Sequence, residues 1–157
     1  MIVLTRQTVA QLVEQAKQSS RRRQNLNIHL DTAAAINRLL NAVEPDSYVR
    51  PHRHPDKDET LLAVAGSFAL LFFDNDARVT RREMLGGTGA ALIEYPANTW
   101  HSLIALESGS VFFEVKAGPY VAVASEDYLP GWPLENSTDV PRALRWLGSA
   151  KPGDKLV

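Results

Sequence analysis

Turn-forming residues recur at short intervals through the middle of the chain, and this pattern limits the fold more than any other feature. Clusters of Pro, Gly, Asn and Asp separate short apolar segments, which are INRLLNAV, TLLAVAGSFALLFFD, VTRREML, AALIEYP, WHSLIALE and SVFFEVKAG. Short strands with turn signals roughly every 8 to 12 residues are typical of a β-sandwich or a β-barrel. The sequence therefore predicts an all-β barrel over residues 36–118.

Some segments of this region carry more specific expectations. SYVRPHRH, residues 47–54, is expected to form a strand that leads out of the Glu44-Pro45-Asp46 turn. Gly66-Ser67 interrupts a long apolar run and is expected to form the turn of a β-hairpin. Asp74-Asn75-Asp76 and Ser108-Gly109 are expected to form turns between later strands.

The segments that flank the β region have a different character. Residues 1–35 are expected to form a helix and then an extended segment that packs on the barrel. The helix is indicated by apolar residues at helical spacing and by Thr8 as a possible N-cap; they are Val9, Leu12, Val13 and Ala16. Residues 119–157 are rich in proline and tryptophan, which predicts an irregular C-terminal tail with a short helix near residues 141–147. A chain of 157 residues suits one domain.

Composition excludes several classes of function. The net charge of −1 gives no basic excess for nucleic acid. No apolar run approaches the roughly 18 residues that predict a membrane span. The chain has no cysteine, which excludes disulfides, zinc-thiolate sites and thiol nucleophiles. We therefore expect a cytoplasmic protein with no nucleic-acid or membrane partner.

Four side chains that commonly bind metals fall in two clusters. His52 and His54 stand two residues apart, so on a strand both imidazoles point the same way. Glu59 follows after a polar loop that can bring its carboxylate beside them. His101 opens a later strand, and a barrel brings sequence-distant strands around one interior. The pattern predicts a divalent-metal site made of these four residues.

The spacing of these residues resembles the two motifs of the cupin superfamily. His52-x-His54, then Glu59 and Gly66, is similar to the first motif, and Pro96-x-Asn98-x-x-His101 is similar to the second. The resemblance implies a double-stranded β-helix, or jelly-roll, barrel whose metal is held by three His and one Glu. The chain departs from the second motif at Asn98, where glycine is common, and at Ala105, where asparagine is usual. Asn tolerates a left-handed backbone, so the turn at residue 98 is still expected.

A wider resemblance covers most of residues 20–135. RRRQNLNIH, NRLLNAVEPDSYVRPHRHPDKDET, WHSLIALESGSVFFEVKAGPY and a Trp-Pro tail are similar to the WbuC family of cupin-fold metalloproteins. That resemblance implies a role near bacterial surface-polysaccharide metabolism. Homodimers are common among small cupins, so a homodimer is expected.

The donor set narrows the metal but does not select it. Three imidazoles and one carboxylate suit Fe, Mn, Ni, Zn or Co, and no soft ligand favours Cu(I). Four protein ligands on a six-coordinate ion leave two positions for a substrate or water. Two roles are open for Glu59: it is either the fourth metal ligand or an acid–base group beside the metal.

Other side chains are candidates for binding a small molecule. Strand alternation from His52 places Arg50 and Tyr48 on the metal-facing side, and Tyr48 is also a candidate proton donor. Arg38 on the preceding strand could join them. Asn27 and His29 could line the mouth of the site.

Three functions remain open at this point. The chain could be a metal-dependent enzyme of isomerase, epimerase or oxygenase type that acts on a small polar molecule such as a sugar or sugar acid. It could instead be a non-catalytic, metal-dependent module that binds such a molecule. In the third alternative, the metal is structural and no ligand reaches it.

Overall fold

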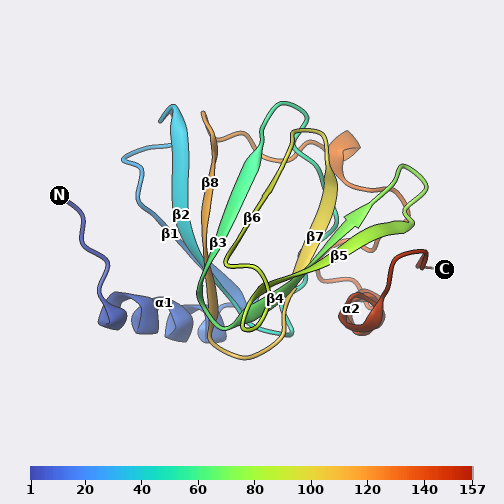
Figure 1. Ribbon diagram of the computed structural model, residues 1–157, viewed down its shortest axis with the longest axis horizontal. Helices are drawn as coiled ribbons and strands as arrows, with labels where there is room; N and C mark the ends of the chain where they lie inside the picture. The colour runs from blue at the N-terminus through green and yellow to red at the C-terminus, as the bar shows by residue number, and fades with distance from the viewer. Residues whose placement is uncertain (157) are drawn as a thin grey trace.

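The computed structural model describes residues 1–156 as two antiparallel β-sheets, with helices α1 and α2 at one end (Figure 1). The N-terminus and the C-terminus lie on opposite sides of the molecule (Figure 1). The elements are α1 (Arg6–Gln18), β1 (Arg23–Asn27), β2 (Ile36–Val43), β3 (Glu59–Ala65), β4 (Ser67–Phe73), β5 (Val79–Gly86), β6 (Leu92–Tyr95), β7 (Trp100–Ala105), β8 (Ser110–Ala117), the 3-10 helix η1 (Ser125–Asp127) and α2 (Val140–Ser149).

Strand order in the sheets is far from sequence order. One sheet has five strands in the order β1-β2-β8-β3-β6, and the other has three strands in the order β5-β4-β7. Consecutive strands β2 and β3, β3 and β4, and β6 and β7 therefore lie apart or in different sheets. Such crossing connections between two packed antiparallel sheets make a jelly-roll barrel. The predicted all-β barrel with an N-terminal helix and an irregular C-terminal tail is confirmed.

Strand β4 is buried on both faces, and this explains its unbroken apolar sequence. Phe68 and Leu70 point into the barrel, where they meet Leu61 and Phe112 from the opposite sheet. The alternate residues of β4 point outward and are covered by the C-terminal segment, in a cluster that includes Leu71, Phe73, Leu129, Trp132 and Leu147. A strand that is covered on both sides reads as continuous apolar sequence instead of alternation. The C-terminal tail thus supplies the outer cover of the smaller sheet.

Helix α1 covers the outer face of the five-stranded sheet. Its buried residues Leu12 and Ala16 pack against Leu40, Ala42 and Val111 of β2 and β8. The helix begins at Arg6, earlier than a cap at Thr8 would allow, because the Thr5 side chain accepts the Thr8 backbone N–H. Thr5 is the N-cap in place of Thr8. The outer side chains of β2 and β8 therefore pack against α1, and the alternate side chains of these strands face the barrel interior.

Two local predictions were wrong for identifiable reasons. Residues 47–54 do not form a strand, and only His52 makes an isolated bridge. Pro51 and Pro55 lack the N–H groups that a continuous ladder needs. Gly66 does not close a hairpin, because β3 pairs with β6 and β8 while β4 pairs with β5 and β7. Gly66 is the point where the chain crosses from one sheet to the other.

Replacing Gly66 with alanine should destabilise the barrel. Its φ of +67° is left-handed, and an added Cβ would stand 2.9 Å from the Cα of Ser110. Left-handed strain and overpacking together should lower the free energy of unfolding by about 2–4 kcal/mol. Gly131→Ala is the matched control, because its φ is +83° and no atom lies within 4 Å of the added Cβ. The control should lose only about 1 kcal/mol, and equal losses in urea denaturation would show that the contact with Ser110 does not matter.

An ion-pair network fastens the C-terminal tail to the start of β1. Glu135 accepts hydrogen bonds from the guanidinium groups of Arg21 and Arg23. Burial alone would raise the pKa of Glu135, but the hydrogen bonds from Arg21 and the charge of Arg23 lower it below its ordinary value. The carboxylate therefore stabilises the fold fully above its unfolded pKa, and this contribution is lost as the pH falls through the lowered folded pKa.

The matching prediction concerns Glu135→Gln. At neutral pH this variant should lose about 1 kcal/mol of unfolding free energy, the upper end of the range for exposed pairs, because the carboxylate remains about one-third exposed. The difference from the parent protein should shrink in acid. Urea denaturation of both proteins at several pH values checks this, and a difference that stays constant with pH would contradict it.

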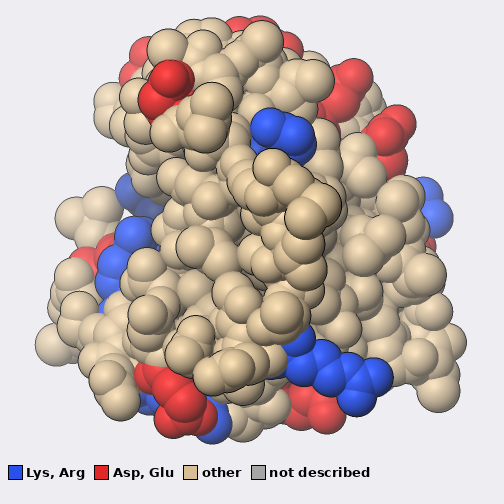
Figure 2. Space-filling model, turned by 90° about the vertical axis from the view of Figure 1, so that its left-hand side faces the viewer, with Lys and Arg blue, Asp and Glu red and all other residues tan. Residues whose placement is uncertain are grey.

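The face that carries α1 has no concentration of charge of one sign. Figure 2 shows the side that lies at the left of Figure 1, where charges of both signs are scattered among uncharged residues. Among residues 1–156, no helix has the length and apolarity that crossing a membrane requires.

Candidate metal centre

A backbone bridge brings the two histidine clusters together. The N–H of His52 donates to the carbonyl of His101 at 3.0 Å, and the N–H of His101 donates to the carbonyl of His52 at 2.9 Å. The N–H of Asn98 also donates to the carbonyl of His54 at 2.7 Å. Asn98 has a φ of +63°, so the left-handed turn expected there is present. The loop after β2 and the start of β7 thus form one unit at one end of the barrel.

Strand register adds a polar row across the sheet. Glu59 is paired directly with Tyr95 of β6 on one side and with Lys116 of β8 on the other. Lys116 is paired in turn with Asn37 of β2. Paired residues point to the same face, so all four side chains face the barrel interior. The interior face of β8 is therefore the one that carries Glu114 and Lys116, which alternation alone did not decide.

The four predicted ligands converge around the Glu59 carboxylate. The Nε2 atom of His54 lies 3.1 Å from Oε1 of Glu59, and Nε2 of His101 lies 3.2 Å from Oε2. The ring of His52 lies 4.5 Å from that of His101 and 5.2 Å from that of His54, centroid to centroid. A cavity of about 150 Å³ is lined by His52, Glu59 and His101 among other residues.

Backbone carbonyls orient two of the imidazoles. Nδ1 of His52 lies 2.9 Å from the carbonyl of Arg50, and Nδ1 of His101 lies 2.9 Å from the carbonyl of Thr99. A carbonyl only accepts, so each Nδ1 carries a proton, and Nε2 is the ring atom left to face the site. Burial lowers the pKa of His52 well below its ordinary value, so this ring stays neutral. Metal-binding histidines are commonly oriented by this kind of outer hydrogen bond.

Lys116 and Tyr95 both contact the Glu59 carboxylate. Lys116 Nζ lies 2.9 Å from Oε1 of Glu59 and 2.6 Å from Oε1 of Glu114, and the Tyr95 hydroxyl donates to Oε2 of Glu59. Burial alone would raise the pKa of Glu59, but the hydrogen bonds to His101 and His54 and the Lys116 charge lower it. Burial alone would lower the pKa of Lys116, but the charges of Glu114 and Glu59 raise it.

The types of donor atom fit a divalent ion, although the Glu59 carboxylate already pairs with His54, His101 and Lys116. Ligand atoms about 2.1 Å from a shared ion lie about 3.0–3.4 Å apart, and the two His–Glu separations of 3.1 and 3.2 Å fall in this range. Nevertheless, no group of three or more His, Asp or Glu in residues 1–156 is arranged around a point that could hold an ion. Lys116 Nζ lies only 3.4 Å from Nε2 of His54, so an ammonium group stands where the ligands converge.

Tyr48 and Arg50, which were predicted to face the metal, make contacts elsewhere. Tyr48 is not on the metal-facing side: it packs in the outer core and its hydroxyl donates to the carbonyl of Pro133 at 3.0 Å. Residues 47–51 are not a strand, so the alternation argument fails there, and Val49 lines the cavity instead. The guanidinium of Arg50 lies over the ring of Tyr128, 4.6 Å from its centroid.

The candidates on β1 and β2 divide between the two faces of the sheet. Arg38 is exposed on the opposite face from Asn37, away from the ligands. Asn27 and His29 do line a cavity of about 280 Å³, which shares Asn41, Glu114 and Lys116 with the ligand cavity. Asn27 and His29 therefore line a cavity that adjoins the ligand cavity, and their role in binding stays a prediction.

Sequence reasoning missed Tyr95 and the position of Lys116. Tyr95 directly precedes the Pro96 motif, and its role follows only from its register with Glu59.

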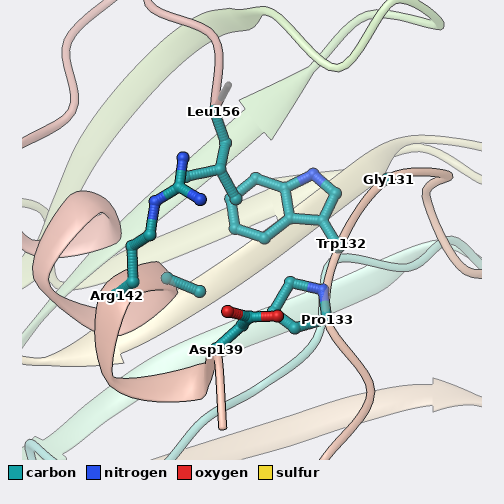
Figure 3. Close-up of a pocket in the computed structure, with 7 residues that line it drawn as sticks. Gly131, Trp132, Pro133, Asp139, Arg142 and Leu156 are labelled. Atoms are coloured by element: carbon teal, nitrogen blue, oxygen red, sulfur yellow. The ribbon is translucent and has the colours of Figure 1, made fainter. Parts of the chain in front are cut away.

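Another cavity, of about 350 Å³, lies on the C-terminal tail (Figure 3). There the side chain of Arg142 extends toward Trp132 and Leu156, with Asp139 and Pro133 nearby (Figure 3). That cavity contains one carboxylate and no histidine, so it is no rival metal site.

Comparisons with known proteins agree with this architecture. Residues 4–85 match a family described as a domain of unknown function, DUF6016. The chain belongs to the DUF6016 family. No protein with a curated description matches its sequence.

Solved structures place this DUF6016 protein in the cupin fold. It is similar to KdgF from Halomonas sp., with a TM-score of 0.50 and 17% identity over 63% of this chain and 82% of that chain. It is also similar to two oxalate decarboxylase variants from Bacillus subtilis, with TM-scores of 0.51 and identities of 19% and 20%. These cover 69% and 68% of this chain but only 28% of each decarboxylase chain. The cupin barrel that the motifs implied is therefore confirmed as the fold.

Proposed function

We propose that this protein is a divalent-metal-binding cupin that binds a small polar molecule beside the ion. The proposed metal ligands are His52, His54, Glu59 and His101. Fe, Mn, Ni, Zn and Co all suit these donors. The observation that carries the proposal is the pairing of Nε2 atoms with the Glu59 carboxylate at 3.1 and 3.2 Å.

That pairing needs a positive charge between its partners. Nδ1 of His101 already carries a proton, so a neutral His101 would aim a lone pair at a carboxylate that only accepts. A second proton on the ring or a metal ion resolves the conflict. The site lies within a buried cluster of three imidazoles, where several imidazolium charges would repel one another. One divalent ion between Nε2 of His101 and the Glu59 carboxylate would remove the conflict without a second proton on the ring.

The residues around the site indicate which chemical groups a bound ligand would meet. A bound divalent ion supplies Lewis-acid character that polarises an oxygen atom of the ligand. Tyr95 keeps its proton, because burial and the Glu59 charge raise the pKa of its hydroxyl well above the ordinary value. Its hydroxyl therefore orients Glu59, and Lys116 offers a buried ammonium at the same carboxylate. These groups can hold a proton close to a bound oxygen, which suits isomerase or epimerase chemistry as well as simple binding.

The adjoining cavities favour an open site over a purely structural metal. The ligand cavity shares Asn41, Glu114 and Lys116 with a second, polar cavity, so a small molecule has room next to the ligands. The resemblance to the WbuC family supports a sugar or sugar acid of surface-polysaccharide metabolism as that molecule. We also propose a cytoplasmic location, from the composition, and a homodimer, because small cupins commonly form one. Light scattering tests the homodimer directly.

The deciding experiment is to identify the metal and count its open positions. The protein should be purified with each of the five metals, its metal content measured, and the Mn(II) form studied by electron paramagnetic resonance in ¹⁷O-labelled water. Line broadening by bound water would support an open site. A stoichiometric metal without bound water would favour the structural alternative, and the absence of tight binding to any of the metals would refute the proposal. Product analysis with sugars and sugar acids then separates an enzyme from a binding module.

A further inference from the structure

The second polar cavity contains a buried side chain that has no partner. Asn37 on β2 is 2% exposed, and neither its amide nitrogen nor its amide oxygen has a hydrogen-bond partner among the described residues. Its side chain lines the cavity of about 280 Å³. An unpaired buried polar group costs roughly 1–3 kcal/mol. The fold thus keeps a buried donor and a buried acceptor side by side, at a cost, in the wall of this cavity.

The surroundings of Asn37 are rich in amides. Asn25 and Asn27 of β1 and Asn41 of β2 line the same cavity. Asn25 donates to Asn27, and Asn41 donates to Glu114, so each asparagine is oriented while part of its hydrogen-bonding capacity stays free. Oriented amides that present a donor and an acceptor together are suited to adjacent hydroxyl groups, each of which donates and accepts.

The charges of the cavity favour a neutral ligand. Lys116 is the cationic group in the lining, and it is already paired with Glu114 and with Glu59. No free cation in this lining is available for an added carboxylate or phosphate. Tyr120 lies at the rim and is 59% exposed, which offers an aromatic face to the C–H side of a sugar ring.

We propose that this asparagine-lined cavity binds a neutral, hexose-sized carbohydrate unit, with Asn37 donating to one hydroxyl group and accepting from its neighbour. The inference rests on the proposed function in that it places the ligand next to the metal centre and chooses a neutral sugar over a sugar acid. The volume lies near the lower limit of ligand pockets, roughly 300 Å³, and suits a single ring.

The test uses the full chain and named sugars. Glucose, galactose and N-acetylglucosamine should be titrated into ¹⁵N-labelled protein, with glucuronate and galacturonate as charged counterparts. The Asn37 side-chain amide signals, identified by their absence in Asn37→Leu, should shift saturably with at least one neutral sugar. The matching uronate should bind at least about tenfold more weakly, because it finds no free cation. No saturable shift with any neutral sugar, or tighter binding of the uronates, would overturn the inference.

Two variants separate binding from structure. Asn37→Leu should weaken neutral-sugar binding at least about tenfold, yet it should unfold at the same or a higher temperature because it removes two unpaired polar groups. Should that variant not fold, Tyr120→Ala on the exposed rim should still weaken binding about tenfold. Arg38→Gln, on the outer face of the same strand, is the control and should bind normally. Unchanged binding in both cavity variants would refute the assignment.

Metal titration of the same samples distinguishes this inference from the proposed function. Metal binding should be equal in the parent protein and in Asn37→Leu, because Asn37 contacts none of the proposed ligands. If metal binds and no neutral sugar does, only the carbohydrate assignment fails. If a neutral sugar binds and no metal does, the metal centre fails and the cavity assignment stands.

Discussion

His101→Ala should abolish stoichiometric metal binding. Outer hydrogen-bonding partners of a metal ligand are alone worth about 10–100-fold in affinity, so loss of a ligand should cost more than about 100-fold. The expected result is that the purified variant contains almost no metal and gives no saturable heat on titration with Zn(II) or Mn(II). Metal analysis and titration calorimetry measure both quantities.

The chain offers a matched control for this variant. It has four histidines, and His29 is the one outside the proposed ligand set. His29 lines the second cavity and makes a hydrogen bond with the backbone of Arg38. His29→Ala should therefore keep its full metal content. Equal metal content in both variants would show that the ion, if bound, lies elsewhere.

Lys116→Met should strongly destabilise the metal-free protein. The ammonium of Lys116 is buried between the carboxylates of Glu59 and Glu114, at 2.9 and 2.6 Å. Removing one partner of a buried ion pair costs about 3–5 kcal/mol, because the remaining charge is left uncompensated. We expect this loss of unfolding free energy in chelator-treated protein, measured by urea denaturation.

Metal should partly reverse that loss. Lys116 Nζ stands 2.9 Å from Glu59 and 3.4 Å from His54, so a bound ion and the ammonium compete for the same carboxylate. Saturating metal should therefore raise the unfolding midpoint more in Lys116→Met than in the parent protein. Lys57→Met is the control, because Lys57 is also buried but its Nζ donates to the neutral carbonyl of Pro119. It should lose only about 2 kcal/mol, and identical behaviour of the two variants would contradict the proposed role of Lys116.

Most of the strands and the four candidate metal ligands were predicted from the local sequence. β2 begins and ends where the segment INRLLNAV does, and the turns at Asp74-Asn75-Asp76 and Ser108-Gly109 lie between the strands that they were expected to connect. Their signals are short-range, because turn residues and alternation act within a few positions of the chain. His52, His54, Glu59 and His101 were found by spacing and by resemblance, and the structure brings them together.

Errors arose where tertiary contacts overrode local pattern. Gly66 was expected to close a hairpin, but the partners of β3 and β4 come from distant parts of the chain. Tyr48 was placed by counting back from His52, yet Pro51 interrupts the strand on which that count depends. Long-range pairing of this kind is not encoded in any short window of sequence.

An all-β barrel, with His52, His54, Glu59 and His101 as candidate metal ligands in two motifs, could be predicted from the chain's residues alone. Composition, turn spacing and motif spacing are local properties, so they need no knowledge of which strands pair. Only the tertiary structure decided what surrounds those side chains. Strand register placed Tyr95, Lys116 and Asn37 in one row with Glu59, since residues far apart in the chain become neighbours only when their strands pair.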